Sequence, residues 1–240
     1  IGSPGSGKTM LARRLPTILP DLTFEEALEI TKIYSVSGLL NQKQALISER
    51  PFRSPHHTVS AASLVGGGNS PKPGEVSLAH HGVLFLDEIP EFPRKTLDVL
   101  RQPIEDGVAN ISRVNYSVAY PCRFMLVAAA NPCKCGYYGD FTKKCTCSFR
   151  DAENYLSRLS GPLMDRIDIH IQVPTLKYNE IENEKVEESS EEIKKRVNRT
   201  RKIQQERYKK YGIYCNAHLK GSMIKEFCKV DEKGKKVLKN

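Results

Sequence analysis

The feature that most restricts the fold of this chain is the segment Gly2–Thr9, which matches the pattern G-x-x-x-x-G-K-[S/T] at every fixed position. The glycines of this pattern let the backbone curl until successive N–H groups point at a phosphate. A helix that starts near the lysine adds its positive end, and residues 9–19 have the apolar spacing of a helix. Such a loop must follow a buried strand, so we expect an α/β fold with a parallel sheet.

The whole loop is predicted to bind the phosphates of a nucleotide. Lys8 is expected to reach the β- and γ-phosphates, and the Thr9 hydroxyl is expected to ligate Mg²⁺. The chain begins one residue before the loop, so we expect the natural protein to continue upstream with the strand that the loop requires. The predicted nucleotide-binding residues are Gly2, Ser3, Pro4, Gly5, Ser6, Gly7, Lys8 and Thr9.

A second motif is the apolar run at 83–86, which ends in Asp87 and Glu88. A short continuous apolar run is typical of a buried parallel strand. Downstream of a phosphate loop, Asp87 is predicted to hold Mg²⁺ together with Thr9. Glu88 is predicted to orient and deprotonate an attacking water. The two motifs together indicate an enzyme that hydrolyses a nucleoside triphosphate.

The remaining hydrophobic patterns predict strands that alternate with helices, as in an α/β sheet, followed by a helical appendage. Strands are expected at 83–87, 124–130 and 167–173, and a hairpin at 108–120 with its tip at Val114-Asn115. Helices are expected at 9–19, 23–34, 95–106 (closed by Gly107) and 191–211 (closed by Gly212), and a loop at 66–74. We therefore expect a core at 1–175, a polar linker at 176–192 and a helical region at 193–240.

The net charge of +9 is uneven, because residues 176–240 contribute +7. An excess of this kind suits an acidic partner such as nucleic acid, and it equally suits a solvated lysine-rich surface. No run reaches the roughly 18 apolar residues of a membrane helix, so no membrane partner is expected. The opening residues are not a signal peptide. The seven cysteines, five of them within 122–147, indicate a reducing compartment, and we expect a cytoplasmic protein.

Two cysteine pairs, each of the form C-x-C, stand close together and are separated by nine residues. Four thiolates suit tetrahedral zinc. Residues two apart in an extended chain lie about 7 Å from each other, however, so each pair must bend sharply to share one ion. Structural zinc and reduced, metal-free cysteines both remain open. The four candidate ligands are Cys133, Cys135, Cys145 and Cys147.

Seven segments together resemble the AAA+ ATPases, and within them the magnesium-chelatase-like ComM/YifB family of the helix-2-insert branch. The resemblance implies an αβα P-loop NTPase core followed by the start of a helical lid. It further implies ATP and Mg²⁺ as ligands, and a ring, a hexamer, as the assembly. The segments are Gly2–Thr9, Arg50–Thr58, Val65–Gly68, Pro73–His80, Gly82–Glu88, Asn131–Asp140 and Leu156–Asp168.

The resemblance also assigns roles by position. Asn131 stands where the family keeps a sensor residue, whose amide touches the γ-phosphate or the attacking water. Arg166 matches the arginine finger, which acts on the nucleotide of the neighbouring subunit. Arg158 is a second candidate for that role, and a surface ion pair is the alternative for both. Arg113, near the tip of the hairpin, is the candidate DNA contact in the pore.

Two further points follow from the resemblance. Residues 53–74 match an insertion that also faces the pore in relatives, and they bring Arg53, His56, His57 and Lys72. The family's N-terminal domain and its later lid segment lie outside the sequence, so no sensor-2 arginine is assigned.

Three functions are compatible with these residues. The first is an ATP-driven motor that moves or remodels DNA, with a branch-migration or helicase-like activity associated with competence. The second is a protein-remodelling ATPase that resembles the magnesium chelatase motor subunit. The third is a non-hydrolytic nucleotide switch, which the presence of Glu88 and Arg166 disfavours.

Overall fold

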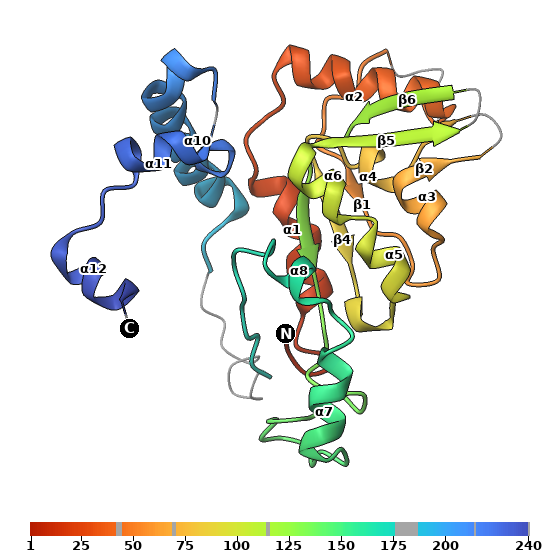
Figure 1. Cartoon of the computed structure of the whole chain (residues 1–240), viewed down its shortest axis with the longest axis vertical. Helices are drawn as coiled ribbons and strands as arrows, with labels where there is room; N and C mark the ends of the chain where they lie inside the picture. The colour runs from red at the N-terminus through yellow and green to blue at the C-terminus, as the bar shows by residue number, and fades with distance from the viewer. Residues whose placement is uncertain (42–44, 69–70, 114–115, 176–186, 214, 240) are drawn as a thin grey trace. The chain divides into compact units, whose positions relative to one another are not determined.

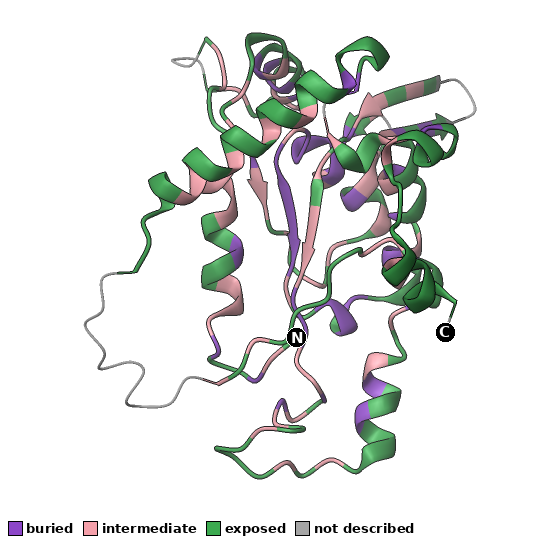
Figure 2. Ribbon diagram, turned by 90° about the vertical axis from the view of Figure 1, so that its left-hand side faces the viewer, coloured by how far each residue is buried: buried purple, intermediate pink, exposed green. Residues whose placement is uncertain are grey.

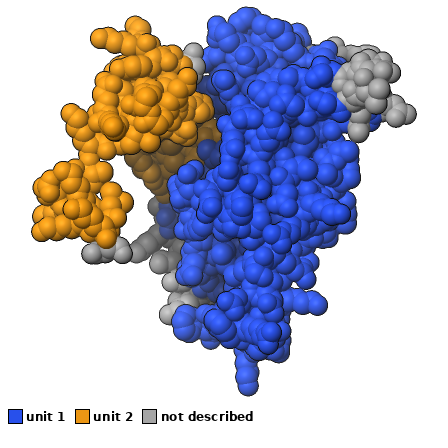
Figure 3. All heavy atoms as spheres, viewed as in Figure 1, with its two compact units in different colours: residues 1–17, 21–187 blue, residues 18–20, 188–240 orange. Residues whose placement is uncertain are grey.

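The computed structural model describes residues 1–41, 45–68, 71–113, 116–175, 187–213 and 215–239, without the side chains of Arg113 and Tyr116. The chain forms two compact units, coloured separately in Figure 3. Unit 1 comprises Ile1–Thr17 and Asp21–Glu187, and unit 2 comprises Ile18–Pro20 and Glu188–Asn240.

The centre of unit 1 is a parallel sheet of three strands (Figure 1). Its order is β1 (Phe52–Arg53), β4 (Val83–Leu86) and β7 (Met125–Ala128). Every residue of β4 is buried, as the purple central strand of Figure 2 shows. The predicted strands at 83–87 and 124–130 are confirmed, and with them the parallel α/β fold.

Successive side chains of β4 enter two different cores, because neighbouring residues of a strand point to opposite faces. Phe85 packs with Ala12 of α1 (Lys8–Ile18) and with Ala129. Leu84 and Leu86 belong to a larger cluster on the other face. That cluster includes residues of α3 (Ala61–Val65), α4 (Glu75–Leu78) and α5 (Arg94–Asp98). The sheet therefore lies between two helical layers, which confirms the αβα sandwich.

The second predicted helix is α2 (Phe24–Ser37). The Thr23 hydroxyl accepts from the Glu26 N–H at 3.2 Å, and Glu26 accepts in return from the Thr23 N–H. This reciprocal capping satisfies two backbone donors that the helix leaves unpaired. The helix ends at Gly38, whose φ is 73°. A local sequence signal therefore fixes the start of this element.

The single helix expected at 95–106 is wrong. The structure has two short helices instead, α5 and α6 (Arg101–Asp106). Pro103 lies in the first turn of α6, and its ring would clash with the carbonyl of residue 99 in a continuous helix. The break follows from that clash. Gly107 ends α6 with φ at 65°, as expected.

The loop expected at 66–74 also needs correction. Gly66–Gly67 (β2) and Lys72–Pro73 (β3) form a small antiparallel ribbon, while 69–70 lie outside the described residues. Glycines carry no side chain that could show a strand pattern, so the hydrophobic pattern misses this ribbon.

The expected strand at 167–173 is reduced to one bridge between Gly2 and Val173. The Val173 N–H donates to the carbonyl of Ile1 at 2.7 Å, and Ile169 and Ile171 are 75% and 64% exposed. Alternating apolar residues become a strand only beside a partner. The segment is joined to Ile1 at two points, since the Ile1 amino group also donates to the carbonyl of Ile171 at 2.7 Å.

The predicted hairpin is confirmed as β5 (Val108–Arg113) and β6 (Tyr116–Pro121). Ala109 and Ile111 of β5 are buried. The expected tip at 114–115 lies outside the described residues. Unit 1 also contains η1 (Ile89–Glu91), α7 (Phe149–Leu156) and α8 (Gly161–Met164).

The main element of unit 2 is the long charged helix that the sequence predicts, α10 (Ser190–Tyr208). It continues through η2 (Lys209–Tyr211), η3 (Asn216–His218), α11 (Gly221–Phe227) and α12 (Glu232–Leu238). A small core of Tyr208, Ile213 and Met223, with Leu219 and Phe227 against it, joins α10 to α11 and to the residues between them. Most of the polar segment before α10, residues 176–186, lies outside the described residues. Throughout the described part of the chain, helices lack the length and apolarity that crossing a bilayer demands.

Candidate functional site

The phosphate-loop segment connects the bridge at Gly2 to the start of α1. The Gly2 N–H donates to the carbonyl of Ala130 at 3.2 Å, so the loop starts beside the residues that follow β7. Gly5 and Gly7 have φ of 81° and 83°, a region that L side chains rarely adopt. The two glycines therefore give the loop the curl that the motif requires.

Lys8 lies folded over this loop. Its ammonium donates to the carbonyls of Gly2 at 2.7 Å and Ser3 at 2.8 Å, and to Oδ1 of Asn131 at 3.3 Å. Partial burial lowers the pKa of Lys8, against the opposite influence of the Asp87 and Glu88 carboxylates. The fold thus brings together residues that stand 123 positions apart in the chain.

Thr9 and Asp87 meet at the same place. The Thr9 hydroxyl donates to Oδ2 of Asp87 at 2.7 Å. Thr9 lies in the first turn of α1, and Asp87 directly follows β4. A hydroxyl and a carboxylate are the hard oxygen donors that Mg²⁺ prefers. The residues present therefore fit the predicted magnesium site.

Glu88 is held in an unusual backbone conformation at the exit of β4. Its φ is 51°, which costs a residue with a side chain about 1 kcal/mol. Its N–H donates to Oδ1 of Asp87 at 3.0 Å, and the next N–H, of Ile89, donates to the carbonyl of Ala129 at 2.9 Å. The side chain is 52% exposed. The turn therefore presents the carboxylate to solvent directly after Asp87.

His57 is a neighbour of Glu88 that the sequence assigned only to a pore-facing insertion. Its Nδ1 lies 4.0 Å from Oε2 of Glu88, and its ring lies against that of His56, tilted by 36° with 3.9 Å between centroids. The sequence analysis singled out the Arg50–Thr58 segment, which includes His57, for its resemblance to the family. Only the fold shows that His57 lies close to Glu88. Arg53 of the same insertion forms a bidentate pair with Glu75 at 2.7 and 2.8 Å, so its charge is used within the chain.

The two candidate finger arginines contact other residues of unit 1. Arg166 donates to the carbonyl of Pro162 at 2.6 Å and pairs with Glu105 of α6. Arg158 lies 3.5 Å from Glu91 and 5.7 Å from the ring centre of Tyr155. Neither pairing excludes the finger role, since a finger acts on another subunit.

The structure gives only a backbone position for the DNA candidate, Arg113. This residue pairs with Tyr116 at the last register position of the hairpin. Its side chain is not among those described.

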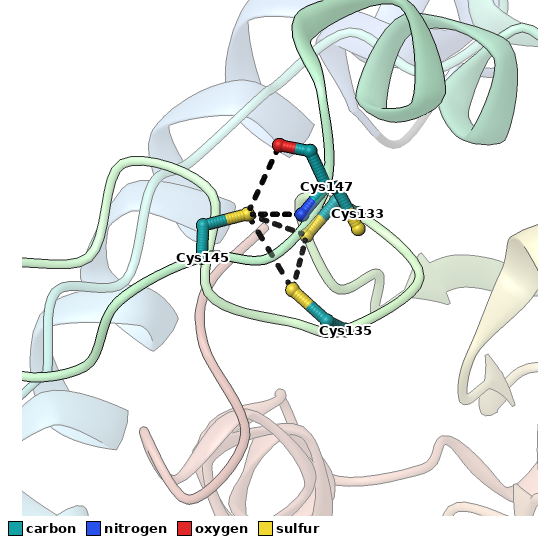
Figure 4. A group of neighbouring side chains, drawn as sticks. All are labelled: Cys133, Cys135, Cys145 and Cys147. Carbon is teal, nitrogen blue, oxygen red and sulfur yellow. Dashed lines mark hydrogen bonds between the residues drawn. The ribbon is translucent and has the colours of Figure 1, made fainter.

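The four predicted cysteine ligands come together in one cluster (Figure 4). The Sγ atoms of Cys133 and Cys135 are 3.3 Å apart, and that of Cys145 lies 3.7 and 3.4 Å from them. Cys147 completes the group, within 4.8 Å of the other three. Each C-x-C pair therefore bends sharply enough for its two sulfurs to bind the same ion.

Backbone amides already face these sulfurs. The N–H of Cys147 donates to Sγ of Cys145 at 3.4 Å. Amides of Thr146 and Tyr137 lower the pKa of Cys135 to about 5, whereas desolvation raises the pKa of Cys145 to about 12. The charged form is therefore favoured at Cys135 and not at Cys145.

Comparison with known proteins gives consistent matches. Residues 1–181 match the family model described as magnesium chelatase, subunit ChlI, and residues 187–240 match the model of its C-terminal part. The chain is 48% identical to YifB of Escherichia coli over 233 residues, which is 96% of this chain and 44% of that protein. It is 46% identical to competence protein ComM of Haemophilus influenzae, over 97% of this chain and 45% of that one.

Among solved structures, the complex of BchI and BchD of magnesium chelatase is similar, with 20% identity and a TM-score of 0.49. The similarity covers 88% of this chain and 61% of that one. The chain spans about half the length of the curated relatives that it matches.

Proposed function

The chain belongs to the magnesium-chelatase-like ComM/YifB family of AAA+ ATPases, and from this premise we propose that it is the ATP-hydrolysing region of a ring-forming motor that acts on DNA. The observation that carries the hydrolytic part is the 2.7 Å contact between Thr9 and Asp87 beside the Lys8 ammonium. Two motifs far apart in the sequence meet there with the donor types that a magnesium–nucleotide complex needs.

Each residue of this group has a role in the proposed reaction. Lys8 and the loop amides would neutralise the β- and γ-phosphates of ATP. Thr9 and Asp87 would hold Mg²⁺, which when bound neutralises charge on the phosphate oxygens. Glu88 would accept a proton from the attacking water. Asn131 would touch the γ-phosphate or that water without adding charge.

The proposed assembly is a cytoplasmic hexameric ring, in which Arg166 completes the site of the neighbouring subunit. A guanidinium suits this role because negative charge builds on the phosphoryl oxygens in the transition state. The position of Arg166 supports a role in trans, since its contacts are with Pro162 and Glu105 rather than with its own phosphate loop.

DNA is the proposed substrate, with a branch-migration or helicase-like activity in competence. The name of the Haemophilus relative, competence protein ComM, supports this choice. The +7 charge of residues 176–240 also supports it, because DNA binding depends on the neutralisation of phosphates. Arg113 at the end of β5 is the proposed pore contact.

Remodelling of a protein partner is the second candidate. It is favoured by the match of the chain to family models described as magnesium chelatase subunit ChlI. The same catalytic residues would serve, and only the polymer in the pore would differ.

The test is the ATPase rate of the full-length protein with and without single-stranded and branched DNA. A DNA motor is expected to be stimulated by at least one of these forms. An ATPase that every DNA form leaves unchanged, in a protein that binds none at low salt, would favour the protein-remodelling function. Absence of Mg²⁺-dependent ATP hydrolysis under all conditions would overturn both.

A further inference from the structure

The cysteine cluster has the dimensions of a single-ion site. Four sulfurs that each lie about 2.3 Å from one zinc ion form a tetrahedron with edges of about 3.8 Å. Three of the thiols already stand 3.3 to 3.7 Å apart, and all are free of disulfides. A cluster of several iron atoms needs wider spacing between its ligand sulfurs. Soft thiolates in a compact group therefore favour one zinc ion.

The segment that carries these cysteines has no regular secondary structure. Residues 133–147 are all described, and they contain no helix or strand. The fully buried Cys133 anchors one end. Without ladders of backbone hydrogen bonds, an irregular segment of this length loses its form unless cross-links fix it. Bound metal would supply four such links.

The segment presses directly on the phosphate loop through Gly136. A Cβ built on Gly136 would lie 2.6 and 2.7 Å from Cγ and Cδ of Pro4. The proline ring of the loop therefore contacts the backbone that directly follows Cys135. Gly136 also has φ of 89°, so no other residue fits this position without strain.

A second contact joins the same two segments through Asp140, which lies between the cysteine pairs. The hydroxyls of Ser3, Thr142 and Thr175 hold the pKa of Asp140 well below its usual range. The Thr142 and Thr175 hydroxyls donate to this carboxylate at 2.6 Å each. Ser3 is a residue of the phosphate loop, and its influence on Asp140 puts the loop close to the cysteine segment.

A third link is the chain itself. Asn131, which accepts from Lys8 at 3.3 Å, stands two residues before Cys133. The cysteine segment and the residues beside it therefore approach the phosphate loop at three residues, which are Ser3, Pro4 and Lys8.

We propose that a zinc ion bound by Cys133, Cys135, Cys145 and Cys147 braces the phosphate-binding loop, so that loading of this cluster sets the affinity of the chain for nucleotide. The nucleotide part rests on the proposed function, whereas the metal site and its mechanical connection to the loop do not.

The first experiment counts metal in the full-length protein purified without chelator. About one zinc per chain is expected, and Cys135→Ser and Cys145→Ser should lose it. Cys228→Ser is the control, because Cys228 is exposed and outside the cluster. Wild-type protein that contains no zinc and takes up none from added zinc would overturn the metal site.

The second experiment measures the connection to the loop without relying on catalysis. Removal of zinc by a chelator should weaken binding of ADP about tenfold, and added zinc should restore it. Hydrogen exchange at residues 2–9 should become faster in the same samples. Unchanged exchange at these amides would overturn the bracing. If the zinc-loaded protein binds no nucleotide, the proposed function fails, and the exchange measurement still decides the bracing.

A third experiment covers the case in which the cysteine variants do not fold. Gly136→Ala should keep zinc, disturb Pro4 and weaken ADP binding. Gly139→Ala is the matched control, because Gly139 also has a left-handed backbone, with φ of 77°, and its Cβ would meet nothing within 4 Å. Equal ADP affinity in the two variants would contradict the proposed contact with the loop.

Discussion

The Thr9 hydroxyl donates a 2.7 Å hydrogen bond to the Asp87 carboxylate across a sequence separation of 78 residues. Parallel strands end at the same edge of a sheet, so the residue after β4 meets the helix that follows the phosphate loop. This contact brings the phosphate loop and the motif that ends at Glu88 into one site. The first prediction tests it.

Replacement of Thr9 by Val should raise the Mg²⁺ concentration needed for ATP hydrolysis by at least tenfold, because the methyl group cannot ligate the ion. Thr9→Ser keeps the hydroxyl and should remain close to wild type. A magnesium titration of ATPase in the full-length protein measures both. Equal magnesium dependence of the two variants would remove Thr9 from the metal site.

Replacement of Glu88 by Gln should leave ATP bound but uncleaved, because an amide cannot accept the proton of the attacking water. Glu91→Gln removes a neighbouring carboxylate that pairs with Arg158, and it should retain turnover. The measurements are ATP affinity and single-turnover hydrolysis. Normal cleavage by Glu88→Gln would show that another group is the base.

Arg166→Ala should lower kcat by about 10³-fold and leave ATP affinity nearly unchanged, as expected for a finger acting in trans. Mixing it with Lys8→Ala should restore part of the activity, since each subunit supplies what its neighbour lacks. Glu105→Gln removes the partner of Arg166 and should not reduce kcat. Weakened ATP binding without rescue in the mixture would assign Arg166 to its own subunit.

Arg113→Ala should reduce the dependence of DNA binding on salt, by about 0.7 in the log–log slope for each phosphate of a single strand that the variant no longer neutralises. Basal ATPase should stay unchanged, while stimulation by DNA falls. Lys95→Ala, which removes an exposed lysine of α5, is the control. An unaltered slope in Arg113→Ala would place the hairpin outside the DNA path.

His80 gives a prediction for the pH dependence of stability. Its Nε2 lies 3.0 Å from Glu29, and its Nδ1 accepts from the Arg123 N–H at 3.0 Å. The ring is buried, and burial lowers the pKa of His80 to about 4, with further contributions from His81 and Arg123. Since Nδ1 is an acceptor, the folded state needs the neutral ring.

Because the pKa of His80 is lower in the folded than in the unfolded state, the unfolded state binds more protons between pH 6.5 and 4. The free energy of unfolding should therefore be highest above pH 6.5 and fall by up to roughly 3 kcal/mol as the pH approaches 4. His80→Gln keeps a donor for Glu29 but cannot titrate, so its stability should vary less over this range. Urea unfolding at several pH values measures the difference, and parallel pH profiles would contradict the assignment.

Local sequence patterns were sufficient to predict the helices and strands whose structure depends on their own residues. The capping box at Thr23 starts α2, the apolar run at 83–86 is a buried strand, and Gly107 ends a helix. Hydrophobic patterns were insufficient to predict the structure where one residue interrupts a helix or where a strand needs a partner segment. Pro103 divides the helix expected at 95–106, and the segment at 167–173 forms only one bridge, between Val173 and Gly2.

The sequence by itself determined which residues form the candidate site, since the order of residues in Gly2–Thr9 and in the run that ends at Glu88 specifies donors, charge and the helix that follows. It left open whether four cysteines in two C-x-C pairs could share an ion. Only the tertiary structure decided that their sulfurs meet, that His57 lies beside Glu88, and that Gly136 touches Pro4. The physical reason is that these contacts join segments far apart in the chain, and their distances depend on how the parallel sheet and its connections pack.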